Sequence, residues 1–201
     1  MRTDAAAQPP SILQIYRERL KAGADAAYEA IEEETARVSA SLGCPHPYLA
    51  AELLSGATEV WWFNGFASMA DRQRVADEYA ANTRFMAALS QNSARKASLT
   101  LDPIDVVATY RPDLTIGAPW ILGRGRFLVV AITTSDEAVG GTVFEAGDGR
   151  RYVVNAAQTR GDADAVRMKG DGEFYVCAVR PSFSFPAPAW VAADPSFWQA
   201  S

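Results

Sequence analysis

The residue types best suited to chemistry occur twice in this sequence, in the same order. A glutamate lies within a short apolar segment, an asparagine lies late in the next one, and an arginine precedes a proline. A carboxylate or amide buried without a partner costs several kcal/mol, so such side chains pair with each other or line a wet cavity. An arginine at a strand end is a suitable bidentate partner. The two sets are Glu52, Asn64 and Arg111, then Glu145, Asn155 and Arg180.

Two interpretations of these sets lead to different functions. In the first, the six residues and Trp62 bind a small organic molecule with a carbonyl or hydroxyl group, as a polar floor in an aromatic cavity. Because Trp61 and Trp62 point to opposite faces of a strand, at most one of them lines this cavity. In the second, the sets are internal pairs that only fix the register of a barrel, and the chain is a non-catalytic structural or interaction protein.

One histidine is present, His46, two residues after Cys44 in a proline-flanked loop. A thiol beside an imidazole is typical of a cysteine nucleophile, but a lone loop histidine is more often structural or exposed. A dinucleotide fingerprint, a P-loop, a nucleophile elbow and zinc-ligand spacing are all missing from the sequence. We therefore expect no cofactor and no metal, and the sequence assigns no catalytic residue.

Composition narrows the class of protein. The 201 residues are 49% hydrophobic and carry a formal net charge of −5. An acidic surface repels phosphate backbones, so we expect no nucleic-acid partner. No apolar stretch is long enough to span a bilayer, and the first ten residues lack the apolar core of a signal peptide. The two distant cysteines indicate no disulfide framework. We expect a cytoplasmic protein without a membrane partner, either a monomer or a homodimer.

The first half of the chain predicts the element order β-α-β-β-α-β. Helical spacing followed by Gly43 predicts a helix over 22–42, with Glu32, Glu33 and Glu34 largely on its outer side. The segment 59–66 is apolar on both faces, so we expect a central strand covered on both sides. The other expected elements are strands over 11–20, 48–54 and 104–110 and one helix from Ser68 to near Arg95.

The second half predicts the same order with its first helix lost and its second helix shortened. Strands are expected over 127–134, 142–146, 152–157 and 174–179, with a short helix over 162–168. The segment 182–201 contains five large aromatic rings, so we expect it to pack on the body. The predicted organisation is a loose tail over 1–10, ferredoxin-like halves over 11–112 and 113–181, and an aromatic tail over 182–201.

With this order and its repeat, the sequence resembles the dimeric α/β-barrel superfamily, which includes NIPSNAP-like proteins and antibiotic-biosynthesis-type monooxygenases. The resemblance implies an α+β fold in which tandem βαββαβ units, the second degenerate, close into a pseudo-twofold α/β barrel around a central cavity. Some relatives are cofactor-free oxygenases or haem-degrading enzymes that use Asn, Trp and His. Residues of these types here are Asn64, Trp61 or Trp62, and His46, although they do not match a family motif position by position.

The expected function is therefore binding of a small organic molecule in a barrel cavity, with cofactor-free oxygenation as its enzymatic form. The structural or interaction protein is the alternative. A third hypothesis is a haem-linked protein that uses His46. Whether the chain is an enzyme stays open at this point.

Overall fold

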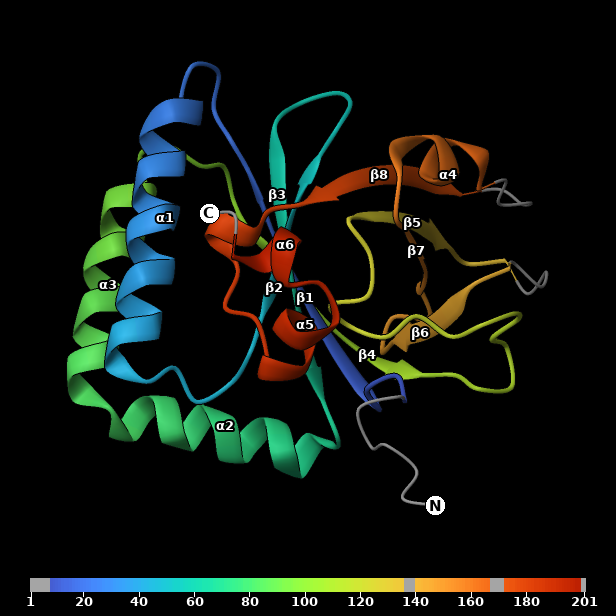
Figure 1. The fold of residues 1–201 in the computed structure, drawn as a ribbon, viewed down its shortest axis with the longest axis horizontal. Coiled ribbons are helices and arrows are strands. Elements are labelled where there is room, and N and C mark those ends of the chain that lie inside the picture. Colours follow the sequence, from blue (N-terminus) through green and yellow to red (C-terminus); the bar gives the residue numbers. More distant parts are fainter. Residues whose placement is uncertain (1–7, 136–139, 167–171, 200–201) are drawn as a thin grey trace.

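The strands form a closed antiparallel barrel, and the long helices lie together on one side of it (Figure 1). The computed structural model describes residues 8–135, 140–166 and 172–199. The barrel order is β1-β3-β2-β8-β5-β7-β6-β4. The strands of the first half are β1 (Ile12–Arg19), β2 (Leu49–Leu53), β3 (Glu59–Phe66) and β4 (Ile104–Tyr110). Those of the second half are β5 (Phe127–Thr133), β6 (Thr142–Ala146), β7 (Arg151–Ala157) and β8 (Glu173–Val179).

The helices of the first half form a layer over its sheet. Helix α1 (Asp25–Leu42) ends at Gly43, whose φ of 73° suits glycine, and the Gly43 N–H donates to the Ser39 carbonyl. The single helix expected from Ser68 to Arg95 is wrong, because the structure has α2 (Met69–Ala81) and α3 (Thr83–Lys96). Asn82 separates them, and its side chain caps α3 by accepting a hydrogen bond from the Phe85 N–H.

The second half has fewer helices among the described residues. Between β5 and β6 the described residues contain no helix, and α4 (Arg160–Ala165) is six residues long. Met168, the end of the helix expected over 162–168, lies outside the described residues, as do residues 1–7 of the predicted N-terminal tail. The predicted α+β fold with a closed barrel is therefore confirmed, and the second half has the shorter helices among the described residues.

The two halves also pair their strands in the same register. Asn64 lies opposite a β1 residue, and Asn155 lies opposite a β5 residue. Glu52 lies opposite Val60, four residues before Asn64. Glu145 lies opposite Arg151, four residues before Asn155. Strands β2 and β8 form one seam between the halves, and β4 and β6 form the other. The two polar sets of the sequence are thus equivalent by cross-strand pairing and not only by their order in the chain.

Side chains fill the interior of the barrel. The alternation of β3 sends Trp61 and Phe63 inward and Trp62 and Asn64 outward. The inward-facing residues of all eight strands form one hydrophobic cluster, which includes Leu13, Ile15, Trp61, Phe63, Leu128, Val130, Phe144, Tyr152, Val154 and Cys177. The interior is therefore a packed core.

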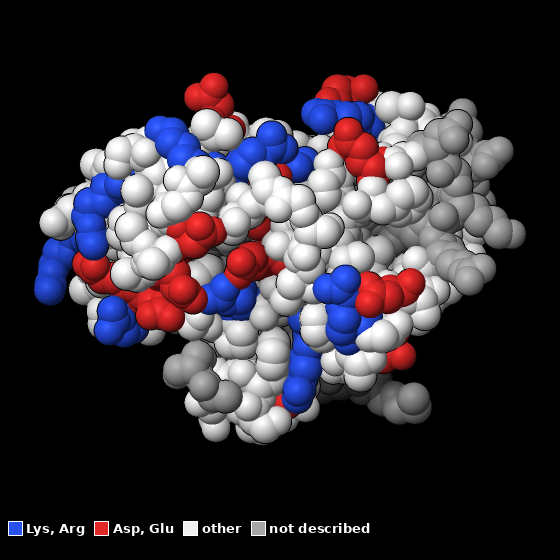
Figure 2. All heavy atoms as spheres, turned by 90° about the horizontal axis from the view of Figure 1, so that it is seen from above, with Lys and Arg blue, Asp and Glu red and all other residues white. Residues whose placement is uncertain are grey.

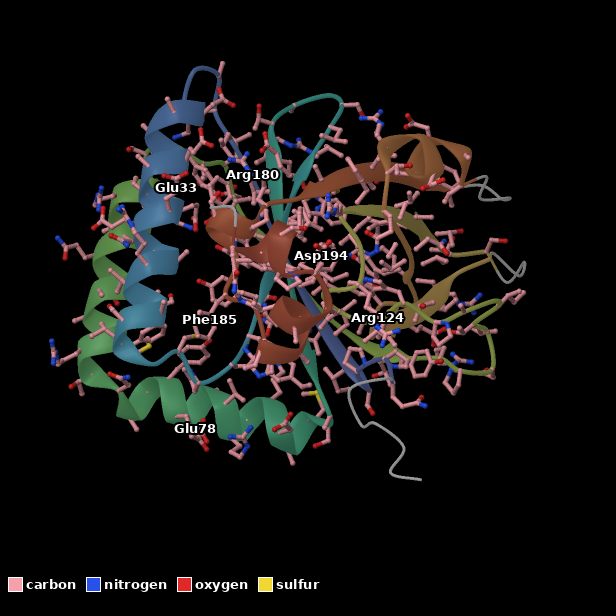
Figure 3. All side chains as sticks on the ribbon, viewed as in Figure 1. Glu33, Glu78, Arg124, Arg180, Phe185 and Asp194 are labelled. Atoms are coloured by element: carbon pink, nitrogen blue, oxygen red, sulfur yellow. The ribbon has the colours of Figure 1, made fainter. Side chains whose placement is uncertain are left out.

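The C-terminal segment packs against one end of this core. It contains a 3-10 turn (Pro181–Phe183) and the short helices α5 (Pro188–Ala193) and α6 (Pro195–Trp198). Trp198 is buried within the barrel cluster, and Trp190 packs against its ring at 5.7 Å between centroids. Asp194, labelled in Figure 3, caps α6 and forms an ion pair of 2.8 Å with Arg126. The segment thereby closes the barrel end with aromatic side chains.

Two surface properties follow from the structure. No helix among the described residues combines the length and apolar character needed to cross a membrane. On the face seen in Figure 2, acidic and basic side chains lie beside each other, so that this face lacks the single-sign basic field that a phosphate backbone requires.

Candidate functional site

Four of the predicted site residues pair with each other across the seams of the barrel. Arg180, which follows β8, donates to Glu52 of β2 and to Glu29 of α1. Figure 3 shows Arg180 between helix α1 and the barrel. The arginine of the second half thus pairs with the glutamate of the first half. The reciprocal contact occurs at the second seam, between Arg111 and Glu145.

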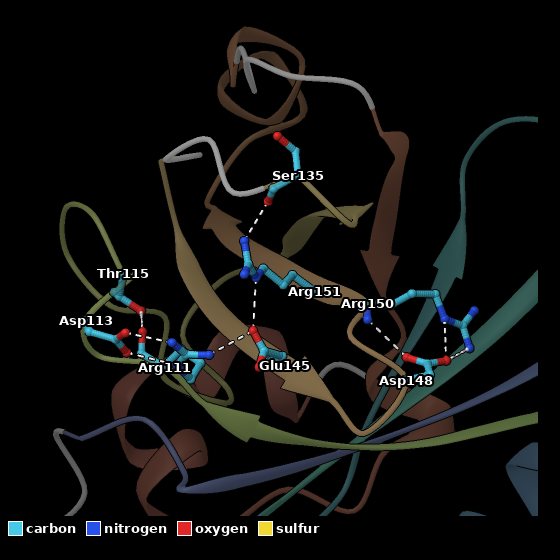
Figure 4. Close-up of polar contacts among 8 residues, drawn as sticks. All are labelled: Arg111, Asp113, Thr115, Ser135, Glu145, Asp148, Arg150 and Arg151. Carbon is cyan, nitrogen blue, oxygen red and sulfur yellow. Dashed lines mark hydrogen bonds and ion pairs between the residues drawn. The ribbon is translucent and has the colours of Figure 1, made fainter.

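At that second seam Arg111 donates to Glu145 at 2.8 Å (Figure 4). Arg151 of β7 donates to the same carboxylate oxygen at 3.0 Å, and Asp113 holds the other side of Arg111. Hydrogen bonds to Asp113 raise the pKa of Arg111. These contacts give both glutamates the partners that a carboxylate removed from water needs. A ligand-binding role for the four residues stays a prediction; they are Glu52, Arg111, Glu145 and Arg180.

The two asparagines have different surroundings. The Asn155 amide donates to the Gly140 carbonyl at 2.9 Å, so the loop before β6 occupies it. Asn64 makes no side-chain hydrogen bond to any described residue and lines a pocket outside the barrel. Its amide is therefore free to bind a ligand, whereas that of Asn155 already has a partner.

This pocket lies between the outer face of the first sheet and the helix layer, and encloses about 340 Å³. We call it the sheet–helix pocket. The outward-facing residues Trp62 and Asn64 of β3 form its floor, away from the barrel interior where the sequence suggested a cavity. Its aromatic walls are Phe66, Tyr79 and Phe85. Aromatic walls with a few polar groups are typical of sites for small organic molecules.

One end of the sheet–helix pocket contains a buried cluster of charges. Lys96 Nζ of α3 lies 2.9 Å from a Glu18 oxygen and 2.5 Å from a Glu32 oxygen. Tyr28 donates to Glu18 at 2.6 Å. Burial raises the pKa of Glu32, although the Lys96 ammonium opposes this shift. Burial alone would lower the pKa of Lys96, but the two carboxylates raise it above its ordinary value, so Lys96 is a cation.

The other end contains the only histidine of the sequence. The His46 ring stacks on Phe66, with 4.5 Å between centroids, and its buried Nε2 has no hydrogen-bond partner. Burial lowers the pKa of His46, so the imidazole is neutral at pH 7. The Cys44 thiol contacts Tyr79 and the His46 carbonyl instead of the imidazole, and burial raises its pKa. A protonated thiol is a poor nucleophile, but a neutral imidazole can exchange a proton with a ligand.

Sequence reasoning missed Glu32 and Lys96. The prediction that Glu32 lies largely on the outer side of its helix is wrong, since Glu32 is 3% exposed and faces the sheet–helix pocket. The signal that could have identified it is helical spacing, because Tyr28, Glu32 and Ser39 recur on one face of α1 and are all buried. Lys96 gave no such signal, since its place depends on how α3 packs against α1.

The pocket also bears on metal and haem. Among the described residues, no group of three or more His, Cys, Asp or Glu side chains could hold a metal ion. A haem would take His46 as its iron ligand, but that ring is stacked on Phe66 and a haem macrocycle is larger than a space of about 340 Å³. The residues of this pocket do not fit a haem.

Comparison with known proteins places the fold. No protein-family model and no curated protein matches the sequence. A solved structure from Fusobacterium nucleatum, named "Putative monooxygenase", matches with a TM-score of 0.50 and 10% identity, over 85% of this chain and 92% of that one. This likeness shows the fold alone, and the fold is the α/β barrel that the resemblance of the sequence implied. Two further solved structures match with lower TM-scores.

A protein named "Putative Chlorite dismutase" has a TM-score of 0.48 and 8% identity, covering 86% of this chain and 95% of that one. A "Putative monooxygenase" from Lactobacillus acidophilus NCFM has a TM-score of 0.45 and 10% identity, covering 86% and 94%. At 10% identity the Fusobacterium structure shows the architecture alone, and any activity has to be argued from the pocket.

Proposed function

We propose that this chain binds a small organic molecule of one or two rings in the sheet–helix pocket. The observation that carries the proposal is a pocket of about 340 Å³ in which aromatic walls surround the half-buried Asn64 amide and the buried His46 Nε2, which has no hydrogen-bond partner. Leaving a buried group such as His46 Nε2 unpaired is unfavourable, so a ligand that completes its hydrogen bond gains affinity.

The enzymatic form of this proposal is oxygenation of the bound molecule without a cofactor. Neutral His46 would accept a proton from an acidic hydroxyl of the ligand, and Asn64 would hold the oxygen that becomes negatively charged. The Fusobacterium structure, which has a similar fold, is named "Putative monooxygenase"; this name agrees with the enzymatic form but adds only a likeness of architecture.

The binding proposal is tested with a blocked pocket. Ser93 lies on α3 at the rim of the sheet–helix pocket and is exposed, so Ser93→Phe should fold normally and fill the entrance. Ser90→Phe, on the same helix but outside the pocket lining, is the matched control. Ligand-observed NMR with a set of one- and two-ring aromatic compounds should give binders that Ser93→Phe loses and Ser90→Phe keeps. Binders that both variants keep would locate the site elsewhere.

The enzymatic form needs a separate test. With 2-naphthol, oxygen uptake should exceed the rate without protein, and His46→Ala should lower it to that rate. Binding without oxygen uptake would remove the oxygenase and retain the binding function.

A further inference from the structure

Negative charges outnumber positive ones at the end of the sheet–helix pocket opposite His46. Two carboxylates, Glu18 of β1 and Glu32 of α1, share one ammonium, Lys96 of α3. Glu18 receives hydrogen bonds from both Tyr28 and Lys96. When both carboxylates are ionised, the cluster of Glu18, Glu32 and Lys96, which we call the inner cluster, holds one more negative than positive charge in a buried place.

Glu32 is the carboxylate of the inner cluster that lines the pocket. Its Oε1 forms an ion pair of 2.5 Å with Lys96 Nζ, the ammonium that it shares with Glu18. Glu32 is 3% exposed and lines the pocket together with Trp62. A buried carboxylate that shares one ammonium with a second carboxylate can accept a further cationic donor.

We propose that the inner cluster selects ligands with a protonated amine at one end of an aromatic body, and that Glu32 binds this amine. The inference rests on the proposed binding function and names the class of ligand. A ligand ammonium makes the cluster neutral and gives the Glu32 carboxylate a second cationic partner through a charge-assisted hydrogen bond, which is a strong one. The Trp62 ring also lines the pocket, and an aromatic face attracts cations. The Lys96 Nζ already lies 5.2 Å from the centroid of this ring.

The same cluster should reject an anion. A ligand carboxylate would add a third negative charge to one ammonium in a place that water reaches poorly, and like charges there repel strongly. Lys96 does not reverse this preference, because both of its carboxylate partners are held within 3 Å of it.

Three compounds with one aromatic body and different ends test the selection. Tryptamine carries an ammonium, 3-ethylindole is neutral, and indole-3-acetate carries a carboxylate. Isothermal titration calorimetry on the full chain near neutral pH should rank their affinities in that order, with tryptamine roughly 10- to 100-fold tighter than 3-ethylindole, the range of one charge-assisted hydrogen bond.

A pair of variants then assigns the effect to Glu32. Glu32→Gln should bring the affinity of tryptamine to that of 3-ethylindole and leave 3-ethylindole unchanged. Glu33→Gln changes the same charge at the next position of α1, outside the pocket lining, and should leave the affinities of all three compounds unchanged.

The outcomes separate the two proposals. Binding of none of the three compounds would contradict the binding function itself. Equal affinities, or tighter binding of indole-3-acetate, would overturn the selection and leave the binding function standing. An unchanged affinity of tryptamine in Glu32→Gln would also overturn it. If that variant failed to fold, the ranking in the unmodified protein would still decide.

Discussion

The two halves of the barrel share strand order and cross-strand register but differ in what covers them. In the first half, α1 of 18 residues and α3 of 14 residues cover the outer face of the sheet and enclose the sheet–helix pocket. In the second half the covering helix, α4, has six residues. The comparison shows that the barrel is common to both halves and that the helix layer of the first half encloses the pocket.

The equivalent asparagines make this difference specific. Asn64 and Asn155 occupy the same register position, both facing outward. Asn64 has helices above it and a free amide, whereas Asn155 holds the Gly140 carbonyl of its own half. At the same position of the sheet, the asparagine of the first half is a candidate ligand-binding residue, and that of the second half forms a structural hydrogen bond.

The largest expected effect concerns what the halves share, the packed interior. Trp61 is fully buried and contacts Phe63, Tyr175 and the Arg17 guanidinium, which lies 4.0 Å from its ring centroid. Trp61→Ala should lower the free energy of unfolding by roughly 3–5 kcal/mol, measured by urea denaturation. The outward neighbour Trp62→Ala should cost less, since Trp62 borders a pocket. An equal loss at both positions would contradict a packed core with an open outer face.

The second prediction compares the two asparagines directly. Asn64→Leu should keep the fold and weaken tryptamine binding roughly tenfold or more, because one hydrogen bond to the ligand is lost. Asn155→Leu should keep the affinity and lower the free energy of unfolding by about 1 kcal/mol, as its bond to Gly140 is lost. Calorimetry and urea denaturation of both variants give the four values. The reverse pattern would assign the site to the second half.

The third prediction concerns pH and Glu32. Because burial raises its pKa, the folded protein holds a proton that the unfolded chain has lost, at pH values between the ordinary and the raised pKa. The free energy of unfolding contributed by Glu32 should therefore fall as pH rises through this window. The groups facing it are Glu18 of β1, Tyr28 of α1 and Lys96 of α3.

Glu32→Gln removes this titration and leaves Lys96 with Glu18 as a balanced pair. Relative to the unmodified protein, the variant should gain stability between about pH 5 and about pH 8, measured by urea denaturation at both values. Glu33→Gln should show no such gain. A variant that loses stability as pH rises would mean that Glu32 is charged and fully compensated in the folded state.

The smallest effects are expected at the seams. Arg111→Ala and Arg180→Ala each break partly exposed ion pairs, so each should cost about 1 kcal/mol or less, and less at high salt. Similar costs at both seams would support the equivalence of the halves. A cost of several kcal/mol at one seam alone would show that the pseudo-twofold relation does not extend to its energetics.

Local patterns were sufficient to predict the architecture. A run of bulky residues, apolar on both faces, located the third strand at 59–66, and the fourth was expected at 104–110; the structure has strands over these residues. The break between α2 and α3 was missed, because Asn82 interrupts a continuous helical stripe and acts through a side-chain cap. Caps of this kind depend on single hydrogen bonds that periodicity does not report.

The site was less predictable than the fold. Trp62 and Asn64 both lie on the predicted third strand, but the face of the sheet that they occupy depends on which face turns inward when the barrel closes. Glu32 lies between other glutamates in the sequence, and its burial follows from the packing of α1 against the sheet and α3. Such contacts are tertiary, so spacing alone could not identify the inner cluster.

The central claim, that the ligand site is the sheet–helix pocket and not the barrel interior, is tested most directly by the five tryptophan indole N–H signals in an NMR titration with tryptamine. Each signal is assigned by a Trp→Phe variant. Trp62 lies in the pocket, whereas Trp61, Trp120 and Trp198 belong to the barrel cluster. We expect the Trp62 signal to shift with added tryptamine while the other three stay in place. A shift of Trp61 or Trp120 with Trp62 unmoved would contradict the claim.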